Sequence, residues 1–225
     1  FRDVTSAAPG QLMPSASAKT GKTPVSVTFK QFGETAVFAV VCSEDQSLFL
    51  YRAGGAAEDA EDFTLLKKVS LGVDGVSLVF GSRNPNDPFL YYCFGGGHDS
   101  MAGVFSLRDL KNHGRAFGDA MDAAVSAKGD MIYVRGPWSP SGFNSLLLQN
   151  SLLDEKPEFG TLVHEHESRG AYFPDPFGRM TIAGSSAYDQ TLAHKLGDVP
   201  ISHPVFFESP PVIVGFAGDQ NPNAR

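Results

Sequence analysis

Residues 25–52, VSVTFKQFGETAVFAVVCSEDQSLFLYR, contain three short apolar segments that are separated by two polar turns. Val25, Val27 and Phe29 alternate with other residues, which is the period of a strand that has one face against a core. Residues 37–42 are continuously apolar, which is typical of a strand covered on both faces. The last segment alternates again after the second turn. The stretch therefore predicts an antiparallel meander whose first strand turns its Val and Phe side chains inward.

The same order of strand, turn and buried strand recurs along the chain, and residues 63–71 supply an outer fourth strand to the first unit. The first turns of the successive units lie near Gly33, Asn86, Gly129, Phe177 and Pro210, mostly about 43 to 53 residues apart. The later units are predicted to contain the strands 76–80, 89–94, 103–107, 123–126, 131–135, 144–149, 160–164, 171–173, 180–183, 191–195, 204–207 and 212–216. This spacing is close to the roughly 40–50 residues of a four-stranded propeller blade.

On this spacing the sequence resembles the β-propeller superfold over residues 25–216, with blades of WD40-like length. It lacks the Gly-His and Trp-Asp signatures of WD40 repeats, and its only tryptophan, Trp138, lies in an expected loop. The resemblance implies an all-β fold of antiparallel meander repeats, a propeller of about five blade-like units of which the last is incomplete. A β-sandwich or two small barrels would also contain many short strands, and these are the alternative folds.

The two ends of the chain differ in composition from the repeats. Residues 1–24 are rich in Ser, Ala, Pro, Gly and Thr, so we interpret them as an extended N-terminal arm. Residues 25–217 are the propeller-like domain, and residues 218–225 are expected to be a flexible tail. The chain begins at Phe1 without the basic start and apolar core of a secretory signal. Processing of an organellar or secreted precursor, or trimming of the chain, would explain this start, so the localisation stays open.

Composition and charge exclude several classes of partner. The net charge is −7, with 18 basic and 25 acidic residues, which argues against nucleic acid. No apolar stretch approaches the roughly 20 residues that span a bilayer, so we expect no membrane insertion.

Cys42 and Cys93 occupy equivalent places in consecutive units, and we expect both to be buried thiols beyond disulfide reach. Helix is expected only in short pieces near residues 56–61 and 107–112.

His164 and His166 are the candidate metal ligands. They stand two residues apart on an expected strand, so both imidazoles lie on one side, about 6 to 7 Å apart, and can reach one ion. The sequence reveals no third ligand, and exposed polar residues at a strand end are the alternative interpretation. Residues 95–100, GGGHDS, lack the spacing of a phosphate-binding loop and are interpreted as a hairpin loop. We therefore expect no cofactor.

Aromatic residues outside the buried strands are the candidate ligand-binding residues. Their flat rings can stack on sugar faces, and they are Trp138, Phe143, Tyr172 and Tyr188. They support the alternative function, a carbohydrate-active protein of the glycoside hydrolase or lectin type. Glycoside hydrolysis needs two carboxyl groups across a pocket, and the expected inner strands carry no such acidic pair.

The favoured interpretation is a non-catalytic, propeller-like interaction or scaffold protein, an accessory subunit of a larger assembly. No motif in the sequence indicates a catalytic reaction strongly. The last unit ends after residues 212–216, so we expect its open edge to be covered by the arm or by a strand from another polypeptide. Other protein subunits are thus the expected partners, with carbohydrate as the alternative.

Overall fold

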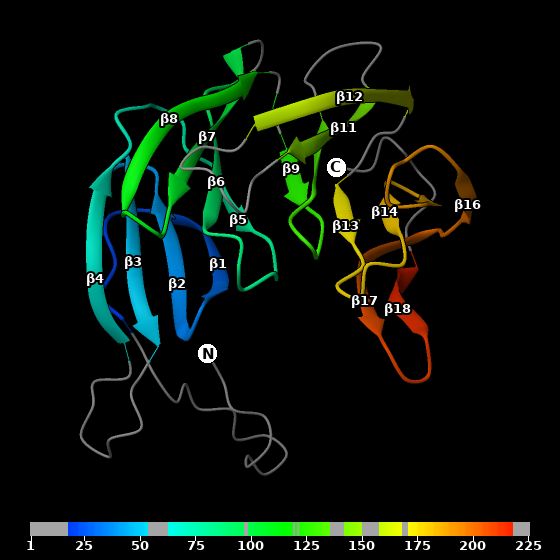
Figure 1. Ribbon diagram of the computed structural model, residues 1–225, viewed down its shortest axis with the longest axis horizontal. Helices are drawn as coiled ribbons and strands as arrows, with labels where there is room; N and C mark the ends of the chain where they lie inside the picture. Colours follow the sequence, from blue (N-terminus) through cyan, green and yellow to red (C-terminus); the bar gives the residue numbers. More distant parts are fainter. Residues whose placement is uncertain are drawn as a thin grey trace.

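The computed structural model describes residues 18–53, 63–96, 99–118, 120, 122–135, 142–149, 158–167 and 171–217. These residues form four antiparallel sheets of four strands each, followed by a two-stranded hairpin (Figure 1). Within every sheet the strands pair in chain order, because each polar turn returns the chain beside the strand it has just formed. The predicted all-β, antiparallel meander architecture is confirmed.

Sheet 1 contains β1 (Pro24–Phe32), β2 (Thr35–Cys42), β3 (Ser47–Ala53) and β4 (Phe63–Ser70). Sheet 2 contains β5 (Leu78–Gly81), β6 (Phe89–Phe94), β7 (Met101–Ser106) and β8 (Lys111–Gly118). Sheet 3 contains β9 (Asp122–Val125), β10 (Met131–Arg135), β11 (Gly142–Gln149) and β12 (Glu158–Glu167). Sheet 4 contains β13 (Tyr172–Pro174), β14 (Thr181–Ala183), β15 (Ser186–Tyr188) and β16 (Lys195–Asp198), and the end hairpin contains β17 (Ile201–Phe207) and β18 (Val212–Ala217).

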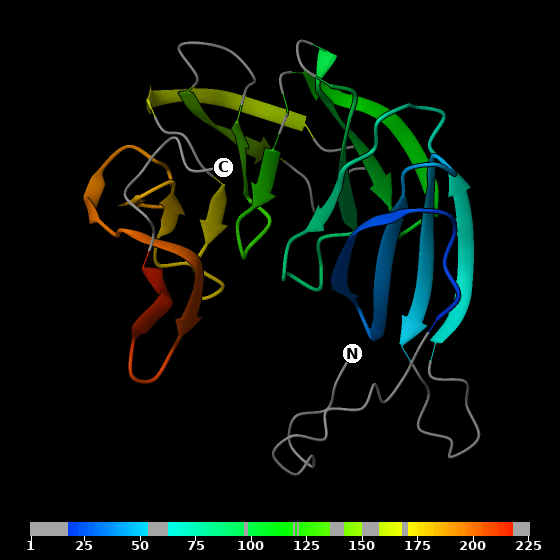
Figure 2. The ribbon, with the colours of Figure 1, turned by 180° about the vertical axis from the view of Figure 1, so that it is seen from behind.

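The sheets and the end hairpin follow one another around an open arc (Figures 1 and 2). The first strands of the sheets, β1, β5, β9 and β13, are successive neighbours on the inner side of this arc. Sheet 1 and the end hairpin stand at its two ends. In the described residues the arc does not close, and the expected propeller of about five units, the last one incomplete, stays a prediction.

Three apolar cores lie between successive sheets. The first, between sheets 1 and 2, includes Leu50 and Leu90, which are both fully buried. The second, between sheets 2 and 3, includes Tyr91 and Ile132. The third joins Tyr133 to residues of sheet 4. Each internal sheet is thus covered on both faces, which is why the second strands read as continuous apolar runs.

The first strand contradicts the prediction made from its alternation. Val25, Val27 and Phe29 are 44%, 57% and 51% exposed, whereas Lys30 on the opposite face is fully buried. The reason is that the face of β1 bearing Lys30 is turned toward sheet 2, while no sheet among the described residues packs against the face bearing Phe29. The period of two is correct, but the inward face is the other one.

Two other local predictions are wrong. The helix expected near residues 107–112 is a turn followed by the start of β8, and residues 56–61 lie outside the described ranges. Residues 191–194 of the strand expected at 191–195 form a turn and Lys195 begins β16, because the short strand β15 already fills the third place of sheet 4. No helix in the described part of the chain is long and apolar enough to cross a membrane.

The expectation for the two cysteines is confirmed. Cys42 and Cys93 are both unpaired, and their exposed fractions are 0% and 1%. Burial is also the main cause that raises the pKa of the Cys93 thiol to about 12. Both residues therefore serve as small apolar side chains of β2 and β6.

Candidate functional site: the inner turns and the free sheet faces

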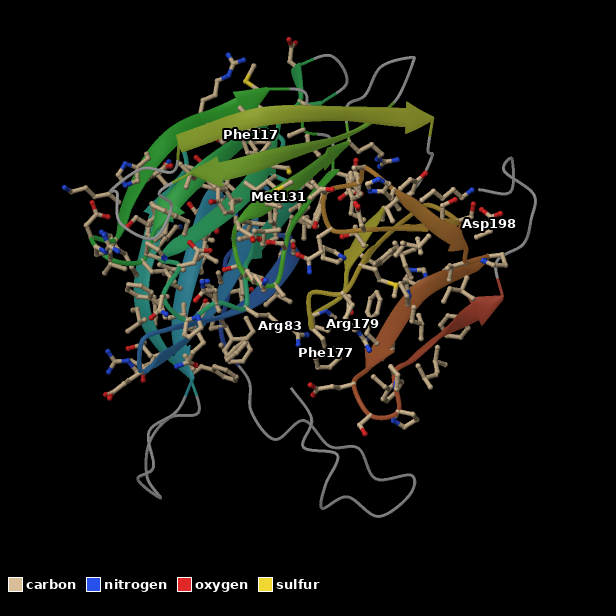
Figure 3. The ribbon with its side chains drawn as sticks, turned by 45° about the vertical axis from the view of Figure 1, so that its right-hand side comes forward. Arg83, Phe117, Met131, Phe177, Arg179 and Asp198 are labelled. Carbon is tan, nitrogen blue, oxygen red and sulfur yellow. The ribbon has the colours of Figure 1, made fainter. Side chains whose placement is uncertain are left out.

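The turns between the first and second strands of neighbouring sheets are joined by hydrogen bonds. These bonds run from the Gly33 amide to the Pro85 carbonyl (2.8 Å), from the Asn84 side-chain amide to the Lys128 carbonyl (2.8 Å), and from the Arg179 guanidinium to the Phe207 carbonyl (3.2 Å). Figure 3 shows Arg83, Phe177 and Arg179 on this side of the arc. The turns form a polar seam that connects sheet 1 to sheet 2, sheet 2 to sheet 3, and sheet 4 to the end hairpin.

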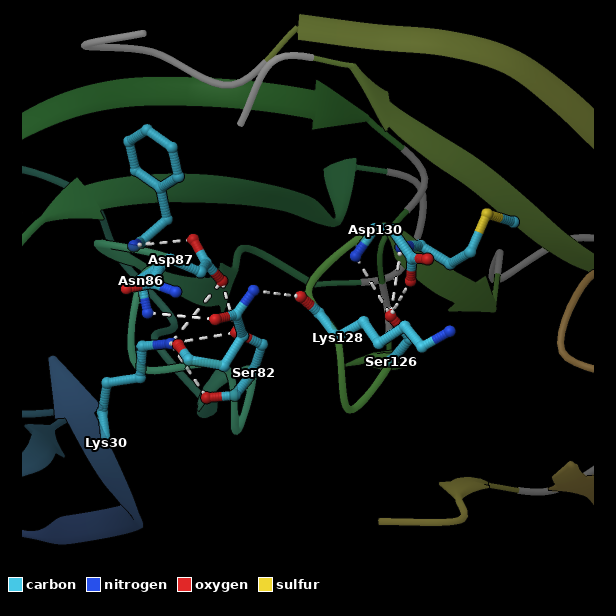
Figure 4. Close-up of polar contacts among 10 residues, drawn as sticks. Lys30, Ser82, Asn86, Asp87, Ser126, Lys128 and Asp130 are labelled. Carbon is cyan, nitrogen blue, oxygen red and sulfur yellow. Dashed lines mark hydrogen bonds and ion pairs between the residues drawn. The ribbon is translucent and has the colours of Figure 1, made fainter. Parts of the chain in front are cut away.

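The buried centre of this seam is the side chain of Lys30 (Figure 4). Its ammonium group donates hydrogen bonds to the Ser82 carbonyl, the Ser82 hydroxyl and the Asn84 carbonyl, each at 2.9 Å. The Asp87 carboxylate lies 3.6 Å from the same nitrogen. Asp87 also accepts hydrogen bonds from the Ser82 hydroxyl at 2.5 Å and from the Phe89 amide at 3.1 Å. Every hydrogen of the ammonium group thus has an acceptor, as a buried charge requires.

Burial dominates the electrostatics of this pair. It lowers the pKa of Lys30, and the nearby Asp87 carboxylate offsets only part of that shift. It likewise raises the pKa of Asp87, against the opposing effects of Lys30 and the Ser82 hydroxyl. Loss of water costs both charged forms free energy, and each charge limits the cost of the other. The pair is therefore stable only while both partners are present.

The same three side chains resemble the components of a serine nucleophile with a lysine base, but their burial excludes that chemistry. Ser82 is 2% exposed, and Lys30 and Asp87 are fully buried. A substrate cannot reach the Ser82 hydroxyl without separating sheet 1 from sheet 2. The cluster is a structural clamp between two sheets and not a catalytic centre.

Related polar turns occur in sheets 3 and 4. In sheet 3 the Ser126 hydroxyl donates to the Asp130 carboxylate at 2.6 Å. In sheet 4 the Asp175 carboxylate accepts hydrogen bonds from the Phe177 amide and the Arg179 side chain. Burial acts to raise the pKa of Asp175, but these hydrogen bonds outweigh it and hold the pKa below its usual range. Each turn thus satisfies its backbone amides with its own side chains.

Gly129 lets the turn of sheet 3 approach the clamp closely. Its φ of +82° lies in the left-handed region, and a Cβ at this position would stand 2.8 Å from an Asp87 carboxylate oxygen and 2.9 Å from the Ser82 hydroxyl. A larger residue would be strained in the turn and would push the third sheet away from the second.

Of the four aromatic ligand-binding candidates, Tyr172 and Tyr188 have side chains that the structure describes. Tyr172 is buried between sheets 3 and 4, where its hydroxyl donates to the Val134 carbonyl at 2.6 Å. Tyr188 is half-buried and packs against the same core cluster. Phe143 lies on β11, and Trp138 lies outside the described residues. The two described candidates, Tyr172 and Tyr188, thus belong to one core cluster, and Trp138 and Phe143 stay predictions.

The histidine candidates both lie on β12, as the sequence predicted for a strand. The backbone of His164 is paired with Asn144 of β11, and that of His166 lies where the register of this pair shifts. Their side chains lie outside the described residues. Among the side chains that are described, no group of three or more His, Cys, Asp or Glu could hold a metal ion.

Sequence reasoning missed the Lys30 clamp, although two signals point to it. Lys30 follows the alternating apolar positions of β1 directly, and Asp87 stands in the polar turn 83–88 that precedes an apolar strand. A lysine so close to a core needs a buried partner, but only the tertiary contact between sheets 1 and 2 identifies Asp87 as that partner.

The outer face of sheet 1 is a large apolar surface that is covered only in part. Phe38, Cys42, Phe49 and Tyr51 form a cluster on this face. The Tyr51 hydroxyl donates to the Lys19 carbonyl at 2.7 Å, so the segment that precedes β1 crosses part of the cluster. The inner row of the face, formed by the exposed Val25, Val27 and Phe29, stays open among the described residues.

The end hairpin carries a second open apolar face. Val205 pairs with Val214, and Phe207 pairs with Val212, so these four side chains share one face, and Phe216 extends it along β18. Their exposed fractions lie between 40% and 73%, with Phe216 the most exposed. We call this surface the hairpin face, and the row Val25, Val27 and Phe29 the sheet 1 face. Each face joins several exposed apolar side chains into one patch, whereas single exposed apolar side chains are ordinary on a protein surface.

No protein-family model and no curated protein matches the chain. Solved structures do. The hydrazine synthase of Kuenenia stuttgartiensis has a TM-score of 0.56 at 12% identity, over 88% of this chain and 57% of that one. KlAtg21, in complex with the coiled-coil of AgAtg16, has a TM-score of 0.54 at 12% identity, over 89% of this chain and 61% of that one.

These likenesses concern the fold alone, since the identities are low. With TM-scores above 0.5, the two structures share the fold of this chain over most of its length. The chain spans about three-fifths of the length of these two neighbours.

Proposed function

We propose that this chain is a non-catalytic, propeller-like interaction protein and acts as an accessory subunit of a larger assembly. The observation that carries the proposal is the pair of open apolar faces at the two ends of the arc. Exposure of apolar side chains to water is unfavourable, and Phe216 is 73% exposed. A protein partner that covers these side chains removes that cost.

The interior of the molecule holds the sheet 1 face in place, and the Arg179 hydrogen bond to the Phe207 carbonyl attaches the end hairpin to sheet 4. Three apolar cores and the buried clamp of Lys30 join successive sheets. The charged groups of the clamp are fully buried, so a substrate cannot reach them. Rigid sheets that present fixed surfaces are suited to assembly, because little side-chain or backbone freedom is lost when a partner binds.

Isolation of the tagged chain from its native source tests the proposal. We expect the wild-type chain to elute in a complex of fixed stoichiometry, measured by size exclusion with light scattering. Val214→Asp, on the hairpin face, should release the chain as a monomer, whereas Leu196→Asp should not. Leu196 is a matched control, because it is 56% exposed on β16 and lies outside both faces.

A monomeric wild-type chain would refute the proposal. Saturable binding of one sugar on a glycan array, unaffected by Val214→Asp, would instead favour the carbohydrate-binding alternative.

A further inference from the structure

The structure itself provides three examples of what covers an apolar sheet face. Between sheets 1 and 2, 2 and 3, and 3 and 4, the covering element is in each case another antiparallel sheet that is apolar on the facing side. The sheet 1 face belongs to the same β-sheet whose opposite side forms the first of these cores. It therefore has the curvature and the side-chain spacing that fit another sheet.

Among the residues that the structure describes, the end hairpin has no third strand, unlike its counterparts. In sheets 1 to 4 the second strand pairs on both sides: β2 with β1 and β3, β6 with β5 and β7, β10 with β9 and β11, and β14 with β13 and β15. Within the described residues, β18 pairs with β17 alone. Its other edge offers backbone N–H and C=O groups to an added strand.

The composition of β18 is also that of a strand with a neighbour on each side. Residues 212–216, VIVGF, are as apolar as the second strands that are buried between two neighbours. Val214 is nevertheless 53% exposed, while Val41 of β2 is fully buried. The sequence of β18 is suited to a central strand, although it stands at an edge.

Sheet 1 and the end hairpin, which carry the two open faces, stand at the two ends of one arc (Figures 1 and 2). A single partner that covers both faces has to reach from sheet 1 to the end hairpin. Both surfaces are apolar, so the partner must be apolar on both sides, as sheets 2 and 3 are within this chain.

On the basis of the proposed function, we propose that the partner is an antiparallel β-sheet polypeptide that is apolar on both faces and fills the opening of the arc. It adds a strand to the free edge of β18 and packs a sheet against Val25, Val27 and Phe29. The chain spans 61% and 57% of the lengths of the two structural neighbours.

A second copy of the chain fits these observations less well. Its sheet 1 already contains four strands, the number found in every complete sheet here, so docking of that sheet would leave the β18 edge unpaired. Repeated contact between the hairpin of one copy and the sheet 1 face of the next would also produce an open chain of molecules.

Photo-crosslinking of the full chain in a native-source extract tests this inference. The photoreactive residue p-benzoylphenylalanine replaces Phe29 in one protein, Phe216 in a second and Leu196 in a third. We expect the first two to capture the same polypeptide, with crosslinked peptides in segments of alternating or continuous apolar residues. The Leu196 protein should capture it at least about tenfold less. Binding of that polypeptide should also slow amide exchange in β18.

Each other outcome contradicts the inference in its own way. Capture of two different proteins by Phe29 and Phe216 would overturn it and leave the proposed function intact. Crosslinks to a second copy, to lipid or to residues 1–24 of the same chain would identify a different occupant. A monomeric wild-type chain with no capture at either position would overturn the inference together with the proposed function.

Discussion

Strands β2 and β18 have the same place in their meanders and nearly the same chemistry, but opposite surroundings. Both are the second strand of a unit, and both are apolar at almost every position. In β2, Ala39 and Val41 are fully buried, whereas in β18, Val214 and Phe216 are 53% and 73% exposed. The difference follows from the neighbours: β2 has a strand on each side and a packed sheet beside it, whereas β18 pairs with one strand in the described part of the chain.

The comparison separates strand formation from strand burial. Apolar, β-branched sequence suffices to form the hairpin, because the turn and the cross-strand pairs are local. Burial needs a second sheet, and this contact comes from residues far away in the sequence. Binding of the proposed partner makes β18 equivalent to β2.

The largest difference is expected in amide hydrogen exchange. Amides of β2 should exchange only by global unfolding, with an opening free energy of about 5–15 kcal/mol. Those of β18 in the isolated chain should exchange at least about a thousandfold faster, because the hairpin opens locally. Exchange followed by mass spectrometry of peptides compares the two strands in one sample. Equal protection of β2 and β18 in the isolated chain would show that β18 is already covered.

Removal of Lys30 should destabilise the contact between sheets 1 and 2, where β2 is buried. Lys30→Met leaves the Asp87 carboxylate buried without its cation, which we expect to cost about 3–5 kcal/mol in urea unfolding. The double variant Lys30→Met/Asp87→Asn should recover part of this loss, because an amide keeps hydrogen-bonding capacity without charge. Lys68→Met is the control: its ion pair with Asp45 is 52% exposed on the lysine side, so the cost should stay below about 1 kcal/mol. A cost for Lys30→Met as small as that for Lys68→Met would argue against the clamp.

The same substitution in both strands tests burial directly. Val41→Ala should cost about 1.5–3 kcal/mol, because it removes two buried methyl groups from the core between sheets 1 and 2. Val214→Ala should cost less than about 0.5 kcal/mol in the isolated chain, because that side chain is half in water already. Denaturant unfolding of the two variants measures the difference. Similar losses at the two positions would contradict the exposure of the hairpin face.

The smallest effect concerns the attachment of the end hairpin and depends on pH. Asp175 orients Arg179, whose guanidinium donates to the Phe207 carbonyl of β17. Since the pKa of Asp175 is lower in the fold than its ordinary value of 3.8, its ionised form stabilises the fold above about pH 4. That contribution is lost as the pH falls through the lowered pKa. Lowering the pH from 6 to 3 should therefore reduce the free energy of unfolding of the wild-type chain more than that of Asp175→Asn. A constant difference between the two proteins would show that the pair is not coupled to stability.

Much of the architecture follows from local pattern. Glycine and polar residues at turns such as those near Gly33 and Gly129 separate apolar runs of strand length, so the meanders and their order were predictable. The turn 191–194 was mistaken for part of a strand, because β15 is only three residues long and its pattern is too short to identify.

The candidate site was far less predictable. Trp138, Phe143, His164 and His166 stay predictions, since their side chains lie outside the described residues. Tyr172 was selected as an aromatic loop residue and is a buried residue of β13. The open faces could not be recognised at all, because an apolar residue has the same sequence signal whether its face is covered or not.

By itself, the sequence determined that this protein is an all-β chain of antiparallel meanders, because turns and strands depend on residues that are near one another along the chain. Only the tertiary structure decided which face of each strand is inside. It buried Lys30 and exposed Phe29, its neighbour, since sheet 2 and Asp87 lie on one side of β1 and no described sheet lies on the other. Burial is a property of two surfaces, and the sequence of one strand specifies only one of them.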